Sequence, residues 1–143
     1  MGYLIESSGA IKKIVMVIKE PLMQTLNSSP VVIIPANGST IPCIIAAFIT
    51  GAPNSTSGAF TFNNLRIGDS ATLYQCMVDL QQINSSTLDT GIGYIFNTGR
   101  YVNYSTGGKF DKLKPLELSS NADDLSGTGD FELTLFYYDL PTQ

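Results

Sequence analysis

The chain has 143 residues, of which 43% are hydrophobic and only 14% are charged, and its net charge is −4; this length is typical of one domain with its own core. Histidine is absent, which excludes a Ser-His-Asp triad and His-ligated metal sites. Eight basic residues in an acidic chain also argue against binding to DNA or RNA, which requires clustered Lys and Arg.

Ser, Thr and Asn outnumber the charged residues, and this favours a β-rich protein whose surface is partly hidden in an assembly. The two cysteines, Cys43 and Cys76, lie in apolar stretches, so we expect buried free thiols, although a disulfide between them stays open. The start of the chain is acidic, and its apolar runs are shorter than a membrane helix, so we expect neither a secretory signal nor a membrane span. Five N-x-Ser/Thr sites are interpreted as by-products of polar loops: Asn27, Asn37, Asn54, Asn84 and Asn103.

Residues 11–18 are rich in β-branched side chains and predict the first strand. The second half of this strand is apolar on both faces, so each face must be covered by something. After the break at Pro21, residues 22–27 predict one helical turn. Its inward side chains are expected to be Leu22, Met23 and Leu26.

A proline-bracketed strand over 30–35 and a strand over 41–50 flank the turn dipeptide Asn37-Gly38. This pattern predicts a β-hairpin over residues 30–50. A Gly- and Ser-rich loop over 51–58 then leads to a third strand over 59–66, with Phe60 and Phe62 on one face.

Residues 69–83 fit two structures. A helix over 72–83 gives an apolar face at helical spacing, formed by Leu73, Met77, Leu80 and Ile83. A strand instead gives one face formed by Tyr74, Cys76, Val78 and Leu80. The helix is preferred, because it brings together on its exposed side Gln75, Asp79, Gln81 and Gln82.

A short strand over 115–119 and an acidic loop over 121–130 precede the last strand, 131–138. One face of that strand is predicted to be core: Phe131, Leu133, Leu135 and Tyr137. The other face ends in Phe136 and Tyr138, which suggests that a partner or another sheet covers them. Many short strands with at most one short helix predict an all-β fold, a β-sandwich or jelly-roll-like barrel. We expect a single domain over 11–143 after an N-terminal arm, residues 1–10.

The best candidate binding surface is an aromatic and Asn-rich segment, because Tyr combines a flat apolar face with a polar tip. Its residues are Tyr94, Phe96, Asn97, Arg100, Tyr101, Asn103 and Tyr104. With Phe136 and Tyr138, they are the candidate contacts to a protein partner or a glycan. The one basic cluster, Lys109, Lys112 and Lys114, is interpreted as a solvated loop face.

The acidic loop carries Asp123, Asp124 and Asp130 but lacks the spacing of an EF-hand. We interpret it as a turn rather than as a calcium site. Gly127-x-Gly129 precedes a strand instead of a helix, so it does not predict a phosphate-binding loop. No catalytic residue, cofactor or metal site is predicted, and a hydrolase with a carboxylate pair is the least favoured hypothesis.

Three ordered blocks resemble small structural proteins of tailed bacteriophages. The first is the strand and Ile-Pro-Ala turn of residues 29–38, and the second is Leu65-Arg66-Ile67-Gly68. The third combines Pro115-Leu116-Glu117-Leu118, the Gly127–Asp130 loop and the closing strand at 135–138. The glycine-rich turn is shortened here to Asn-Gly-Ser, and residues 84–110 match no block.

This resemblance implies a β-rich virion protein of the head-decoration, fibre or tail-accessory kind, assembled in the host cytoplasm and free of catalytic residues. It also implies a homo-oligomer, with a trimer favoured, that contacts other virion proteins. We therefore expect a non-enzymatic virion structural protein that binds neither nucleic acid nor membrane. The alternative is a carbohydrate- or receptor-binding module of a phage fibre, using the aromatic segment.

Overall fold

The structure, a computed structural model, describes residues 10–61, 65–69, 78–79, 87–96 and 113–141. These residues form one short helix and ten strands, so the fold is all-β with no long helix, as predicted. The first half comprises β1 (Lys12–Ile18), α1 (Glu20–Gln24), β2 (Val31–Ile34), β3 (Thr40–Gly51), β4 (Ala59–Thr61) and β5 (Leu65–Gly68). The second half comprises β6 (Val78–Asp79), β7 (Thr87–Asp89), β8 (Tyr94–Ile95), β9 (Leu116–Ser120) and β10 (Phe131–Pro141).

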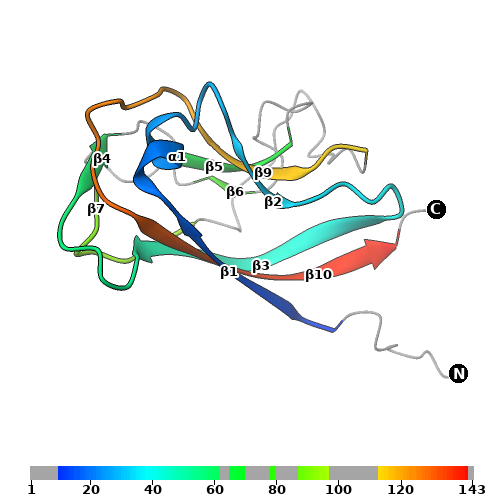
Figure 1. Cartoon of the computed structure of the whole chain (residues 1–143). Coiled ribbons are helices and arrows are strands. Elements are labelled where there is room, and N and C mark those ends of the chain that lie inside the picture. The colour runs from blue at the N-terminus through cyan, green and yellow to red at the C-terminus, as the bar shows by residue number, and fades with distance from the viewer. Residues whose placement is uncertain (1–9, 62–64, 70–77, 80–86, 97–112, 142–143) are drawn as a thin grey trace, which may run out of the picture.

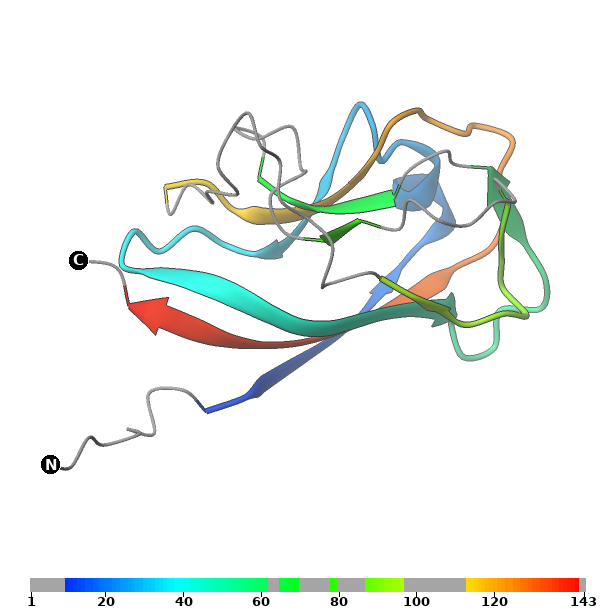
Figure 2. The ribbon, with the colours of Figure 1, turned by 180° about the vertical axis from the view of Figure 1, so that it is seen from behind.

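Two antiparallel sheets form the two layers of a β-sandwich (Figures 1 and 2). The long sheet has the strand order β1-β10-β3-β8, and the short sheet has the order β2-β9-β5-β6. A separate pair, β4 and β7, closes one end. Among the described residues, no helix has the length and apolar character needed to cross a bilayer.

The core lies between the two sheets and is formed by side chains that alternate along each strand. The core face predicted for the last strand is confirmed, because Phe131, Leu133, Leu135 and Tyr137 are all buried. The short sheet contributes Ile33, Leu65, Ile67, Leu116 and Leu118 from the opposite side.

The hairpin predicted over residues 30–50 is wrong. β2 pairs with β9 in the short sheet, whereas β3 pairs with β10 and β8 in the long sheet. The turn at Asn37-Gly38 therefore carries the chain from one layer to the other. The 12 residues of β3 are matched by the 11 of β10, so β3 gains more ladder hydrogen bonds there than the four residues of β2 can offer.

The strand predicted over 59–66 is divided between two sheets. β4 pairs with β7, with Phe60 fully buried, while β5 pairs with β9 and β6; Phe62 lies outside the described residues. The helix preferred over 72–83 is wrong at Val78 and Asp79, which form β6 against Ile67 and Arg66. The rest of that segment lies outside the described residues. An open edge of β5 supplies backbone partners, and these override the helical spacing.

The predicted helical turn exists as α1, but one of its three inward side chains is assigned wrongly. Met23 and Leu26 are fully buried, whereas Leu22 is 46% exposed. The helix ends at Gln24, so Leu26 is placed by the turn that follows and not by helical spacing from Leu22.

Candidate interaction surface

The long sheet has a second face, directed away from the core, which we call the outer face. Cross-strand register places its side chains in rows, since residues that are directly opposite point to the same side. The central row contains Val15, Thr134, Phe48 and Ile95. One flanking row contains Lys13, Phe136 and Ala46, and the other contains Val17, Glu132 and Thr50. Tyr138 and Cys43 form a further opposed pair beyond the Lys13 row.

Several apolar side chains of the outer face are uncovered within the single chain. Val15 is 49% exposed, Val17 45% and Ile95 69%. On the opposite side of β1, Ile14 and Met16 pack against the core. A β-sandwich that functions as a monomer normally has polar side chains on its outward faces. The outer face of the long sheet instead exposes several apolar side chains, a composition that is typical of a contact surface.

Aromatic contacts order the centre of the outer face. The rings of Phe48 and Phe136 meet edge to face, with centroids 6.3 Å apart, and the ammonium of Lys13 lies 5.7 Å from the centroid of Phe136. Next to them, a hydrogen bond with the Cys43 thiol raises the pKa of Tyr138. Cys43 is a free, half-buried thiol, and Cys76 lies outside the described residues.

The predicted aromatic segment is only partly on the surface. Phe96 is 1% exposed and belongs to the core, so its assignment as a contact residue is wrong. Tyr94 is half-buried, and its hydroxyl accepts a 3.1 Å hydrogen bond from the N–H of Asp89. Because side chains alternate along β8, Ile95 is the residue that points outward. The other candidates, Asn97, Arg100, Tyr101, Asn103 and Tyr104, lie outside the described residues.

The sequence identified Phe136 and Tyr138 on the outer face but missed Phe48, Ile95 and the two valines of β1. A signal for the valines was present, because residues 11–18 are apolar on both faces. No comparable signal marked Ile95, since its strand is two residues long and is defined only by pairing with Phe48 and Ile49.

Main-chain N–H groups donate hydrogen bonds to the carboxylates at the start of the acidic loop. Asp123 Oδ1 accepts hydrogen bonds from the N–H groups of Asn27 and Ser28, at 2.8 and 3.0 Å. Asp124 Oδ2 accepts one from the N–H of Thr61, at 2.8 Å. Hydrogen bonds from Ser28 lower the pKa of Asp123, and the bond from Thr61 lowers that of Asp124.

The end of the loop is tied to the start of α1. Asp130 accepts a 2.8 Å hydrogen bond from the N–H of Glu20 and forms a 3.0 Å ion pair with Lys19. Both interactions lower the pKa of Asp130. In return, Glu20 accepts a 2.7 Å hydrogen bond from the N–H of Gly129. These carboxylates anchor the loop to the rest of the fold, and the described part of the chain holds no cluster of three potential metal ligands.

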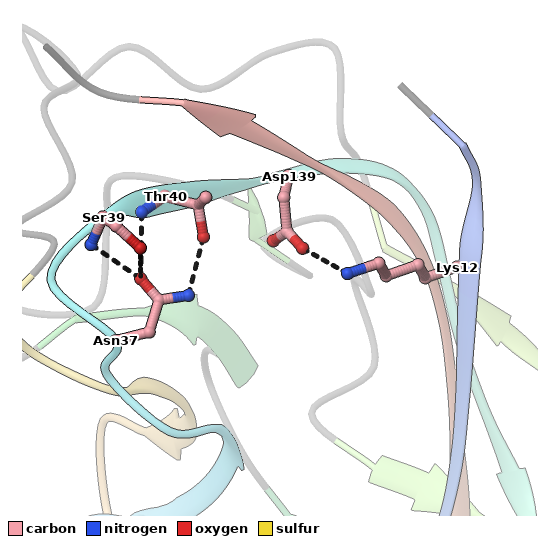
Figure 3. Close-up of polar contacts among 5 residues, drawn as sticks. All are labelled: Lys12, Asn37, Ser39, Thr40 and Asp139. Carbon is pink, nitrogen blue, oxygen red and sulfur yellow. Dashed lines mark hydrogen bonds and ion pairs between the residues drawn. The ribbon is translucent and has the colours of Figure 1, made fainter. Parts of the chain in front are cut away.

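Polar contacts secure the opposite end of the sandwich (Figure 3). Asn37 Oδ1 accepts hydrogen bonds from the N–H groups of Ser39 and Thr40, and its Nδ2 donates to the hydroxyl of Thr40. Across the same end, Lys12 of β1 forms an ion pair with Asp139 of β10. This pair joins the first and last strands of the chain.

A small hollow beside these contacts has room for about one water molecule. It is therefore too small for a sugar or a cofactor. Its lining includes Ile34, Pro35, Asn37, Lys114, Leu116 and Asp139. Lys114 is exposed, whereas Lys109 and Lys112 lie outside the described residues.

Two carboxylates interact electrostatically at the short sheet, Glu117 of β9 and Asp69 directly after β5. Burial raises the pKa of Glu117, and the charge of Asp69 raises it further. Asp69 has none of its surface exposed. A hydrolase needs both carboxylates to flank a substrate, so this pair does not supply such a site.

Comparison of the chain with protein-family models, with curated proteins and with solved structures gives no match.

Proposed function

We propose that this chain is a non-enzymatic structural protein of a bacteriophage virion. It serves as a capsid-decoration protein or as a component associated with a head or tail fibre, and it associates with copies of itself and with other virion proteins. The observation that carries the proposal is the uncovered outer face of the long sheet, with Val15, Val17 and Ile95 45–69% exposed.

The build of the domain supports this function. Both layers of the sandwich contribute to one core, and carboxylates anchor the acidic loop at one end while the Asn37 turn secures the other. A particle component needs such a rigid body together with an apolar surface that is completed by a neighbour. The ordered sequence blocks that resemble phage structural proteins suggest a virion as the setting.

The alternative, a glycan- or receptor-binding module of a fibre, is less well supported. It depended on the aromatic segment, and within that segment Phe96 belongs to the core and the hydroxyl of Tyr94 is already hydrogen-bonded. Loss of glycan binding in Tyr101→Ala or Tyr104→Ala would be the result that favours this alternative.

The test uses particles of the phage whose genome encodes the chain. Purified particles should contain the chain in a fixed copy number, and particles from a deletion mutant should bind added chain saturably. Binding of an unrelated β-sandwich of similar charge provides the control. If purified particles lack the chain and deletion particles do not bind it, the proposed function is wrong.

A further inference from the structure

We infer that the outer face of the long sheet binds the outer face of a second copy of this chain, with the two sheets packed face to face about a two-fold axis. This inference rests on the proposed function, since it names the surface and the symmetry of the self-association. It commits to a dimer, in contrast to the trimer that the sequence resemblance implies.

The size of the outer face suits such an interface. Three adjacent strands of 7, 11 and 12 residues give a face about 15 Å wide and about 25–35 Å long. The projected area of this face is roughly 375–525 Å², and the corrugation of its side chains raises the accessible surface towards the roughly 800 Å² that each partner buries in an interface of standard size. Its centre is uncharged, and its two charged groups lie in the flanking rows, as in an apolar interface core with a polar rim.

The central row matches itself under two-fold rotation. If the axis runs along Val15, Thr134, Phe48 and Ile95, in the plane between the sheets, each of these side chains meets its own copy. All four are uncharged, so no like charges are opposed on the axis. In aligned sheets about 10 Å apart, the valine, phenylalanine and isoleucine side chains of the two copies would pack against each other.

The flanking rows exchange places under the same rotation and carry opposite charges. Lys13 lies opposite Phe136, and Glu132 lies opposite Val17, so within one chain the two charges are four residues, about 13 Å, apart along the strands. Rotation places Lys13 of one copy over Val17 of the other, so that Glu132 of the other copy, which lies opposite Val17, is its diagonal neighbour. Within the described residues, neither Lys13 nor Glu132 takes part in an ion pair, and the two-fold arrangement supplies two such pairs.

The first experiment measures the mass of the full chain in solution by sedimentation equilibrium, with an expected value of twice the 15.4 kDa chain mass. Val15→Lys opposes two like charges on the axis and should give a monomer with an unchanged circular dichroism spectrum. The matched control is Val32→Lys, because Val32 is exposed to a similar extent, 45%, but lies on an edge strand of the short sheet. This control should remain a dimer.

The second experiment is a charge exchange. Lys13→Glu and Glu132→Lys should each weaken the dimer by about tenfold or more, because each opposes like charges in both symmetric contacts. The double variant should return to within about threefold of the wild-type dissociation constant. A destabilised fold would not be rescued in this way, so recovery identifies contact between copies.

The outcomes separate this inference from the proposed function. A trimer, or a monomer at all accessible concentrations, overturns the face-to-face dimer even if particles contain the chain. A double variant that is no tighter than the single variants also overturns it. A dimer with the expected variant pattern supports the inference even if particles lack the chain, and in that case the virion function alone fails.

Discussion

Phe48 of β3 and Phe136 of β10 meet edge to face on the outer face of the long sheet, with ring planes at 86°. They are diagonal neighbours, because Phe48 lies opposite Thr134 and Phe136 lies opposite Ala46. Both rings remain partly exposed in the single chain. The pair therefore contributes modestly to folding and leaves part of both rings exposed to solvent.

Truncation on the two faces of β10 should have different effects on stability. Phe136→Ala loses an aromatic pair and should lower the free energy of unfolding by about 1 kcal/mol. Leu133→Ala leaves a cavity at a fully buried position and should lower it by about 2–5 kcal/mol. Urea unfolding monitored by circular dichroism, at concentrations where the chain is monomeric, measures both. Equal losses would show that Phe136 is part of the core.

The stability of the fold should decrease in acid. The folded-state pKa values of Asp123, Asp124 and Asp130 are lowered by hydrogen bonds. Their stabilisation is therefore complete above the unfolded pKa of about 3.9 and is lost as the pH falls through the folded values. The urea midpoint should fall between about pH 5 and pH 2.

Removal of one of these charges should flatten that dependence. Asp130→Asn keeps an acceptor for the N–H of Glu20 but has no carboxylate to titrate, so its urea midpoint should vary less with pH than that of the wild type. The raised pKa of Glu117 acts in the opposite direction, because its destabilisation is relieved in acid, and Glu117→Gln should steepen the profile. Profiles parallel to the wild type would argue against these assignments.

Gly127 lies where a methyl group would collide with a buried ring. A Cβ at this position would overlap Cδ1 of Phe60, which is fully buried and packs edge to face on Phe131. Gly127→Ala should therefore destabilise the fold by about 1–3 kcal/mol through overpacking. At Gly91 the nearest atom is the exposed carboxylate of Asp89, at 3.3 Å, so Gly91→Ala should change stability by no more than about 0.5 kcal/mol. Thermal unfolding compares the two.

Asn37 should stabilise the turn between the two layers. Its side chain accepts from two N–H groups and donates to Thr40 Oγ1, so Asn37→Ala should reduce the free energy of unfolding by about 1 kcal/mol. Asn37→Asp keeps the acceptor and loses the donor, so its urea midpoint should lie between those of the wild type and Asn37→Ala. A midpoint for Asn37→Ala equal to that of the wild type would show that the turn is set by Gly38 alone.

Local patterns predicted the long strands better than their partners. Alternation along residues 131–138 correctly separated buried from outward side chains, since side-chain direction in a strand depends only on position. The proposed hairpin over residues 30–50 failed because turn residues such as Asn37-Gly38 allow a reversal but do not choose the strand that pairs afterwards. β3 pairs with β10, some ninety residues further along the chain, and no local signal specifies that contact.

Local patterns were sufficient to predict the all-β class, the core face of the last strand and the two-sided apolar character of the first. Strand pairing in the folded chain was needed to show that Val15, Val17, Phe48 and Ile95 share one uncovered face and that Phe96 belongs to the core. A strand's own sequence specifies which of its residues alternate. The sheet that forms on each side decides which of those residues are covered, and that depends on pairing across the whole chain.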